Sequence, residues 1–168
     1  GHPEYYADLA EKITKERGAF YINQFSNEAN VNAHFEWTGP EIINQLGGKI
    51  DAFCAGVGTG GTLTGVGKAL KKINDNCDLI LADPTGSILE PLFRTGKKPK
   101  TVGSWIVEGI GEDYVPPLLE FNLISHAYSI SDKEAISTCN ELLKKEGILA
   151  GSSSGTLIAA AIRYCKEQ

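Results

Sequence analysis

A glycine-rich turn constrains this chain more than any other feature. The residues Gly56-Val57-Gly58-Thr59-Gly60-Gly61 fit the pattern G-x-G-x-x-G. They follow an apolar run of strand length, from Ile50 to Val57, and precede a helical pattern that begins at Leu63. Backbone N–H groups at the start of a helix, together with the positive end of the helix dipole, bind phosphate. The pattern also fits a tight turn without a ligand, so the neighbouring residues must decide between these interpretations.

The neighbouring residues favour a phosphate monoester over a dinucleotide. Thr59, Thr62 and Thr64 add hydroxyl donors, which suit a terminal phosphate with three oxygens better than a pyrophosphate link. A dinucleotide-binding domain of the Rossmann type would use Asp83, at the end of the next strand, to hold a ribose. Because Pro84 follows directly, Asp83 is at least as readily interpreted as the cap of a turn.

The order of apolar patterns predicts an α/β fold. The run from Ile50, the helical pattern from Leu63 to Ile73 and the apolar run at Leu79–Ala82 form a strand, helix, strand unit typical of a parallel sheet. The remaining elements that we expect are strands at 19–22, 105–107 and 126–130, and helices at 4–17, 38–46, 132–146 and 152–163. Glycines and prolines make residues 83–117 loop-rich. No repeat or linker divides the chain, so residues 1–168 are expected to be one unit.

A second glycine-bounded turn, Gly151-Ser152-Ser153-Ser154-Gly155, opens the last predicted helix. One serine hydroxyl would suffice to cap that helix. Three hydroxyls between glycines favour a turn in which one faces a ligand while others cap.

The composition favours a small-molecule partner. The formal net charge is −5, without a long run of one sign, which argues against electrostatic binding to nucleic acid or a membrane surface. No stretch approaches the roughly 18–20 apolar residues of a membrane span, and we expect a cytoplasmic protein. The four scattered cysteines have no CxxC spacing, so we expect buried reduced thiols and no metal site. The absence of methionine indicates a fragment.

Taken together, these motifs resemble the fold type II, or β-family, enzymes that use pyridoxal 5′-phosphate. Cystathionine β-synthases and cysteine synthases are the most similar groups. The resemblance covers essentially the whole chain. Its carriers are Gln24-Phe25-Ser26-Asn27, Thr38-Gly39-Pro40-Glu41-Ile42, Ala55 to Thr62, Glu108-Gly109-Ile110-Gly111, and Gly147 to Gly151 with the serine turn.

The resemblance implies a site for each part of the reaction. It implies that the cofactor phosphate is held by Gly58, Thr59, Gly60, Gly61 and Thr62. It makes Ser153 the partner of the pyridine nitrogen. It also implies that Gln24 helps to seat the substrate carboxylate, and that Gly109 and Ile110 line the cleft for cofactor and substrate.

The implied fold is the large-domain part of a tryptophan synthase β-like enzyme. A mostly parallel central sheet would be covered by helices, and residues 1–45 would border the smaller subdomain. Family members are usually homodimers, and the apolar faces of this piece would need a partner chain.

The implied reaction replaces the β-substituent of a serine-type amino acid by a thiol, in cysteine and transsulfuration metabolism. A neutral hydroxyl at the pyridine nitrogen does not enforce its protonation, and the milder electron sink that results suffices for β-elimination. Asp83-Pro84 and Val107 to Gly111 look more like cystathionine β-synthase. Cysteine synthase (O-acetylserine sulfhydrylase), a dinucleotide-binding domain and a non-catalytic binding domain remain the alternatives.

The chain departs from the family in one respect. Family members carry a Schiff-base lysine, and a serine-threonine-asparagine loop for the substrate carboxylate, in a segment that should precede these residues. None of the 13 lysines lies in that motif. We therefore expect no catalytic residue within this chain, and expect the chain to be inactive on its own.

Overall fold

The computed structural model describes residues 6–168 and contains a parallel three-stranded sheet. The strands are β1 (Ala52–Ala55), β2 (Asp78–Pro84) and β3 (His126–Ile130), hydrogen-bonded in the order β1-β2-β3. β1 pairs with β2 from Ala52 opposite Asp78, and β2 pairs with β3 from Ile80 opposite His126. The predicted α/β class is therefore confirmed.

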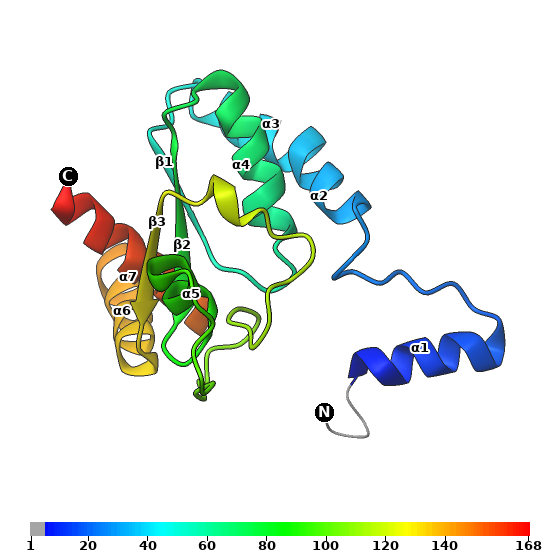
Figure 1. Cartoon of the computed structure of the whole chain (residues 1–168). Helices are drawn as coiled ribbons and strands as arrows, with labels where there is room; N and C mark the ends of the chain where they lie inside the picture. Colours follow the sequence, from blue (N-terminus) through cyan, green and yellow to red (C-terminus); the bar gives the residue numbers. More distant parts are fainter. Residues whose placement is uncertain (1–5) are drawn as a thin grey trace.

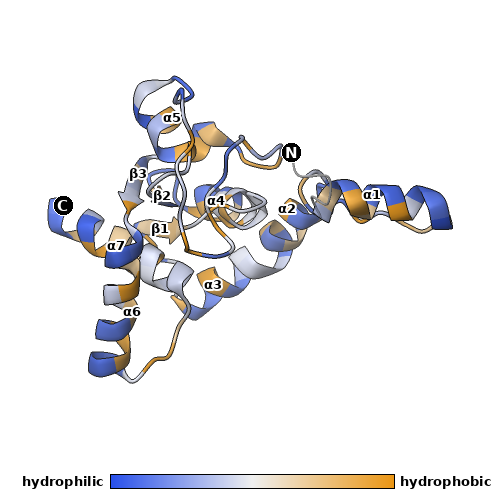
Figure 2. Cartoon of the chain, turned by 90° about the horizontal axis from the view of Figure 1, so that it is seen from below, coloured by the Kyte–Doolittle hydropathy of each residue, from blue (hydrophilic) through white to orange (hydrophobic). Residues whose placement is uncertain are grey.

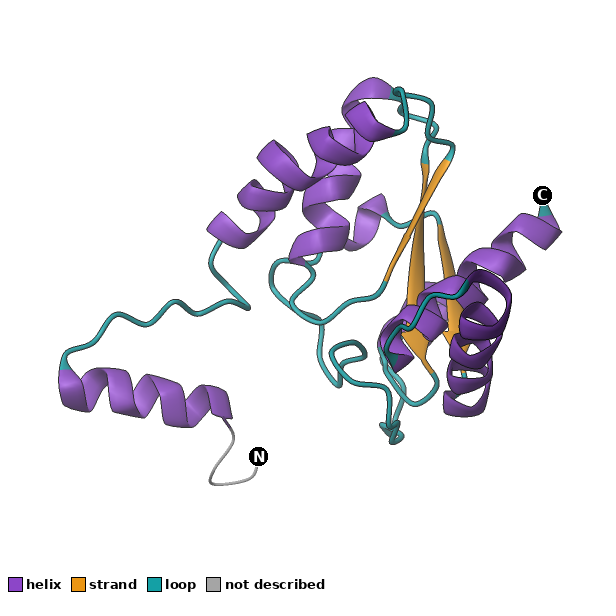
Figure 3. Cartoon of the chain, turned by 180° about the vertical axis from the view of Figure 1, so that it is seen from behind, coloured by secondary structure: helices purple, strands orange, loops and turns teal. Residues whose placement is uncertain are grey.

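Two groups of helices cover the two faces of the sheet (Figures 1 and 3). One group contains α2 (Ala29–Ala33), α3 (Gly39–Gln45) and α4 (Gly61–Ile73), and the other contains α6 (Asp132–Glu146) and α7 (Ser152–Glu167). The side chains of successive strand residues point to opposite faces. Leu81 accordingly packs with Leu63 of α4, and Ala82 packs with Ala159 and Ala160 of α7.

The ends of several elements are well predicted by local signals. β3 and α6 have the predicted bounds. The Ser131 hydroxyl oxygen accepts a hydrogen bond from the Glu134 N–H at 3.3 Å, and Gly147 ends α6 in the left-handed region at φ 70°. Both are the standard devices for starting and stopping a helix, so tertiary contacts are not needed to place these ends.

Other predicted elements are wrong. Residues 19–22 and 105–107 form no strand, because apolar β-branched and aromatic residues make a strand only when a neighbouring strand accepts their hydrogen bonds. The helix expected at 38–46 is present as α3, and the π-helix η1 (His34–Thr38), which was not predicted, directly precedes it. The loop-rich middle contains α5 (Leu89–Thr95), and the short 3-10 helix η2 (Phe121–Leu123) follows it.

The first helix, α1 (Tyr6–Arg17), lies apart from the sheet in two views (Figures 1 and 2). Glu4 and Tyr5, with which the predicted helix began, lie outside the described residues. None of the α1 residues, Tyr6–Arg17, is buried. Within residues 6–168, no helix has both the length and the apolar composition needed to cross a bilayer.

The cysteines are only partly as expected. All four are free, and Cys77 is buried. Cys165, in contrast, is exposed near the end of α7, so the expectation of four buried thiols is wrong. In the part of the chain that the structure describes, no group of three or more His, Cys, Asp or Glu side chains could hold a metal ion.

Candidate functional site

The two glycine-bounded turns lie at the same edge of the sheet. On α7, the carbonyl of Leu157 accepts a hydrogen bond from the Cys54 thiol of β1 at 3.4 Å. Seven residues later, the Tyr164 hydroxyl donates to Asp78 at the first residue of β2, at 2.7 Å. α7 is therefore antiparallel to the strands. Its first turn, with Ser153, points toward the carboxyl end of β1, where the first turn begins.

The first turn is shaped by close contacts with other segments. Gly60 adopts the left-handed conformation at φ 85°, and a Cβ there would lie 2.9 Å from Leu119. A Cβ at Gly58 would lie 2.7 Å from the Gly109 carbonyl oxygen. The Gly111 N–H donates to the Val57 carbonyl at 2.9 Å. Protein contacts thus already require these glycines, and the same geometry would allow the close approach of a phosphate.

Thr59 is the best-placed donor of the turn. Its hydroxyl oxygen accepts hydrogen bonds from the Asn30 side-chain amide at 3.0 Å and from the Gly61 N–H at 3.2 Å. Since the oxygen accepts both bonds, the hydroxyl hydrogen remains free to donate. The same Asn30 amide nitrogen donates to the Gln24 carbonyl at 3.0 Å, so it joins the Gln24 segment to this turn. Sequence reasoning missed Asn30, because a lone asparagine in an irregular stretch carries no pattern.

The other two threonines have different surroundings. The Thr62 hydroxyl lies 3.1 Å from His34 Nε2, and His34 Nδ1 lies 3.0 Å from the Thr38 hydroxyl. Thr64 is buried; it donates to the Leu118 carbonyl at 2.8 Å and accepts from the Glu120 N–H. The interpretation of Thr64 as a phosphate donor is therefore wrong, because its place on the helix turns its hydroxyl into the protein.

A cavity of about 340 Å³ brings together five of the nine predicted site residues. Gln24, Gly58, Thr59, Gly109 and Ile110 all line it. Its other lining residues are Tyr6, Phe25, Trp105, Val107, Gly111 and Glu112. The volume lies at the small end of the range for ligand pockets, roughly 300–1,000 Å³. None of the lining residues in the described chain is a lysine.

The other four predicted residues are not among those that line this cavity. Gly60, Gly61 and Thr62 directly follow Thr59 in the chain, and Ser153 lies at the same edge of the sheet. Gly60 is the N-cap of α4, and Gly61 and Thr62 open that helix. Ser153 is half-buried in the first turn of α7, and its hydroxyl makes no hydrogen bond within residues 6–168. The N-cap of α7 is Gly151, without a side-chain cap, so the expectation that a serine of this turn caps the helix is wrong.

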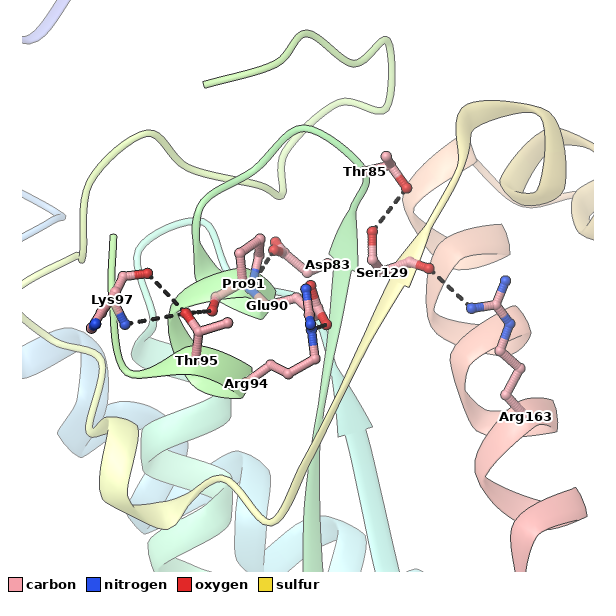
Figure 4. A network of polar contacts seen from close by, with 9 residues as sticks. All are labelled: Asp83, Thr85, Glu90, Pro91, Arg94, Thr95, Lys97, Ser129 and Arg163. Carbon is pink, nitrogen blue, oxygen red and sulfur yellow. Dashed lines mark hydrogen bonds and ion pairs between the residues drawn. The ribbon is translucent and has the colours of Figure 1, made fainter. Parts of the chain in front are cut away.

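The Asp83 side chain is buried and accepts a hydrogen bond from the start of α5 (Figure 4). It is 1% exposed, and its Oδ2 accepts a hydrogen bond from the Glu90 N–H in the first turn of α5 at 2.8 Å. Its Oδ1 is buried without a hydrogen-bond partner among the described residues. Burial raises the pKa of Asp83 to about 6. A residue so enclosed cannot reach a ribose, which removes the main support for a dinucleotide site.

Glu112 is the charged residue of the cavity wall, and sequence reasoning missed it. Its side chain is half-buried. Burial, and after it the nearby carboxylates of Asp113 and Asp83, together raise the pKa of Glu112 to about 7. A glutamate directly after the predicted Gly109-Ile110-Gly111 segment was the available signal, but its orientation depends on the fold.

The family described as pyridoxal-phosphate dependent enzyme matches residues 1–168. The chain belongs to this family. Pyridoxal phosphate is the family's cofactor, and the resemblance drawn from the motifs is confirmed. The dinucleotide-binding alternative is thereby excluded.

Individual relatives match over nearly all of the chain. Cystathionine beta-synthase of Apis mellifera is 39% identical over 166 residues, which make up 98% of this chain and 32% of that protein. Cysteine synthase A of Escherichia coli (strain K12) is 40% identical over 163 residues, which make up 95% of this chain and 50% of that protein. The chain thus spans a third to a half of the curated relatives it matches.

The residues at the first turn fit the phosphate of this cofactor. A helix leaves its first N–H groups without partners inside the helix, and in α4 one of these, that of Gly61, is taken up by Thr59. The other N–H groups of the turn and the free hydroxyl hydrogen of Thr59 make a donor set without a negative charge. Such a set is suited to an anion. The aromatic and aliphatic wall formed by Trp105, Val107 and Ile110 offers an apolar surface of the kind that a flat ring packs against.

Proposed function

We propose that these residues form the cofactor-binding part of an enzyme that replaces the β-substituent of a serine-type amino acid by a thiol. The observation that carries this proposal is the single cavity lined by Gln24, Gly58, Thr59, Gly109 and Ile110. Family membership supports it, and so do relatives named for two such enzymes. In the reaction, the bond from the β-carbon to its substituent breaks and a C–S bond forms. The thiol proton leaves with the displaced group.

In this proposal each residue has one task. Pyridoxal phosphate, when bound, supplies the electron sink that allows the β-substituent to leave. The N–H groups that open α4 and the Thr59 hydroxyl hold the phosphate. Ser153 offers a neutral hydroxyl to the pyridine nitrogen, which leaves that nitrogen without an enforced proton. The Gln24 amide donates to the substrate carboxylate, and Gly109 and Ile110 form the opposite wall.

The lysine of the reaction would come from a segment outside these residues, with residues 1–45 bordering the smaller subdomain. The lysine-free lining of the cavity supports this. We therefore propose that the 168-residue chain is inactive alone, and that the full-length protein acts as a cytoplasmic homodimer in cysteine or transsulfuration metabolism. Exposed apolar side chains, such as Phe20 and Leu149 at 84% exposure each, favour a covering partner.

The test compares the isolated chain with the full-length protein that contains it. Each is incubated with pyridoxal 5′-phosphate, serine or O-acetylserine, and homocysteine or sulfide, and the thioether or cysteine product is measured. We expect product only from the full-length protein. Borohydride reduction followed by peptide mapping should modify no lysine of residues 1–168; a stoichiometric adduct on one of them, with product formed, would overturn the assignment.

Cysteine synthase remains the second candidate, because the two kinds of relatives match almost equally well, at 39% and 40% identity. The two candidates differ in the thiol acceptor, which carries an ammonium group in homocysteine and none in sulfide. Product formation from the two acceptors, compared at equal concentration, distinguishes them.

A further inference from the structure

Glu112 is the only residue with a formal charge among those that line the 340 Å³ cavity in the described chain. The polar side chains around it, Gln24 and Thr59, are neutral. Among residues 6–168, no arginine, lysine or histidine shares the lining. The cavity proposed to hold cofactor and substrates therefore has one carboxyl group and no cation from these residues to balance it.

The backbone of Glu112 is held on both sides. Its N–H donates to the Ser87 hydroxyl oxygen at 3.0 Å. Its carbonyl accepts from the Ile88 N–H at 3.0 Å and from the Ser87 hydroxyl at 3.1 Å. The N–H of the preceding residue, Gly111, donates to the Val57 carbonyl in the turn at 56–61. The point from which the carboxyl group extends is therefore fixed relative to that turn, as specific recognition requires.

The described surroundings of Glu112 contain carboxylates and no cation that compensates its negative charge. Asp83, whose Oδ1 has no partner among the described residues, and the exposed Asp113 both interact unfavourably with a charged Glu112. Burial and these two carboxylates raise the pKa of Glu112. A cationic group on a ligand would offset the repulsion between Glu112 and these two carboxylates, and a small anion such as hydrosulfide would add to it.

We propose that Glu112 binds the ammonium group of the thiol acceptor, and so selects an amino-acid thiol over hydrosulfide. The inference rests on the proposed function and specifies its acceptor. Attraction favours one acceptor while repulsion disfavours the other, and specificity commonly uses both. Glu112 is thus a specificity-determining residue that touches the second substrate.

The kinetic test uses the full-length protein loaded with cofactor, with Glu112→Gln as the variant of equal shape. Three acceptors are compared: homocysteine, its analogue 4-mercaptobutyrate, which lacks only the ammonium group, and hydrosulfide. In the variant we expect the KM for homocysteine to rise about tenfold, because a charged hydrogen bond is lost. The analogue without the ammonium group should show no such rise in KM, and the KM for hydrosulfide should fall.

Two controls separate recognition from structural damage. Asp113→Asn removes a charge one residue away, outside this cavity, and should keep the preference for homocysteine. The KM for the serine-type substrate should be unchanged in Glu112→Gln. In addition, the ratio of the variant's homocysteine KM to that of the wild type should decrease below pH 7, where Glu112 of the wild type becomes protonated.

A binding measurement keeps the inference testable if no product forms, an outcome that would refute the proposed function alone. Methionine, the S-methyl analogue of homocysteine, is titrated into cofactor-free full-length protein, and its binding is measured by calorimetry. We expect Glu112→Gln to weaken methionine binding about tenfold. The matching ligand without an ammonium group, 4-(methylthio)butanoate, should bind the variant no more weakly than the wild type. Two results would overturn the role of Glu112: equal affinities of wild type and variant for methionine, or equal KM changes for homocysteine and 4-mercaptobutyrate.

Discussion

The two glycine-bounded turns differ in how much of the protein holds them. The turn at 56–61 is fixed by Asn30, Gly109, Gly111 and Leu119, which come from three distant segments. The turn at 151–155 begins a helix whose N-cap, Gly151, offers no side chain, and its three serine hydroxyls make no hydrogen bonds within residues 6–168. The turn at 56–61 thus has its hydrogen-bond donors arranged before an anion binds. The turn at 151–155 instead keeps its hydroxyl groups available to a ligand.

The largest expected effect comes from breaking the first turn. Gly60→Asp adds a side chain toward Leu119 and a negative charge beside the phosphate donors, in a left-handed conformation that a side chain disfavours. We expect the affinity of the 168-residue chain for pyridoxal 5′-phosphate or inorganic phosphate, measured by calorimetric titration, to fall at least about a hundredfold. Gly96→Asp carries the same left-handed strain at φ 67° in open space and should bind normally. Unchanged affinity in Gly60→Asp would count against this turn as the phosphate site.

The next effect tests the serine turn in the full-length protein. Ser153→Asp places a carboxylate where we propose the pyridine nitrogen lies, which would enforce protonation of that nitrogen. We expect kcat for β-replacement to fall about a hundredfold, the size seen when a group that stabilises developing charge is altered. Cofactor content should be nearly unchanged. Ser152→Asp, one position earlier in the same turn, is the control, and equal losses in both variants would show only a disturbed helix start.

A smaller effect concerns the amide that links Gln24 to Thr59. Asn30→Ala removes both hydrogen bonds of this amide and leaves the Thr59 hydroxyl free to rotate. We expect about a tenfold loss of phosphate affinity, which corresponds to about 1.4 kcal/mol for two partly exposed bonds. Asn27→Ala also removes an amide with two hydrogen bonds, which donates to the Ile22 carbonyl, accepts from the Ala29 N–H and makes no hydrogen bond to Thr59. If the two variants bind phosphate equally, Asn30 does not organise the turn.

The smallest effect contrasts two helix starts by thermal or urea unfolding. Ser131→Ala removes a hydroxyl that caps α6, and should lower the free energy of unfolding by about 1 kcal/mol. Ser152→Ala removes a hydroxyl that has no hydrogen-bond partner among residues 6–168, and should change the free energy of unfolding by less than about 0.5 kcal/mol. A loss at Ser152 as large as that at Ser131 would contradict the view that the serine turn has no capping role.

Local chemistry was enough to predict many elements of the fold. Ser131 and Glu134 mark the start of α6 and Gly147 marks its end, because these residues satisfy the free backbone groups of a helix whatever lies nearby. The strand β2 contains the apolar run Leu79–Ala82, and β3 has the predicted bounds. Residues 19–22 have the same kind of composition and form no strand, because pairing depends on a partner that local sequence does not specify.

The candidate site divides in the same way. The sequence by itself determined the glycine turn, the helix start behind it and the family resemblance, since these depend on residue types at short, fixed spacings. Only the tertiary structure decided that Thr59 rather than Thr64 keeps a free donor, that Asp83 is enclosed, and that Glu112 lines the cavity with Gln24. The physical reason is that hydrogen-bond partners, burial and charge neighbours are set by segments far apart in the chain, and the packing of the sheet and helices alone brings those segments together.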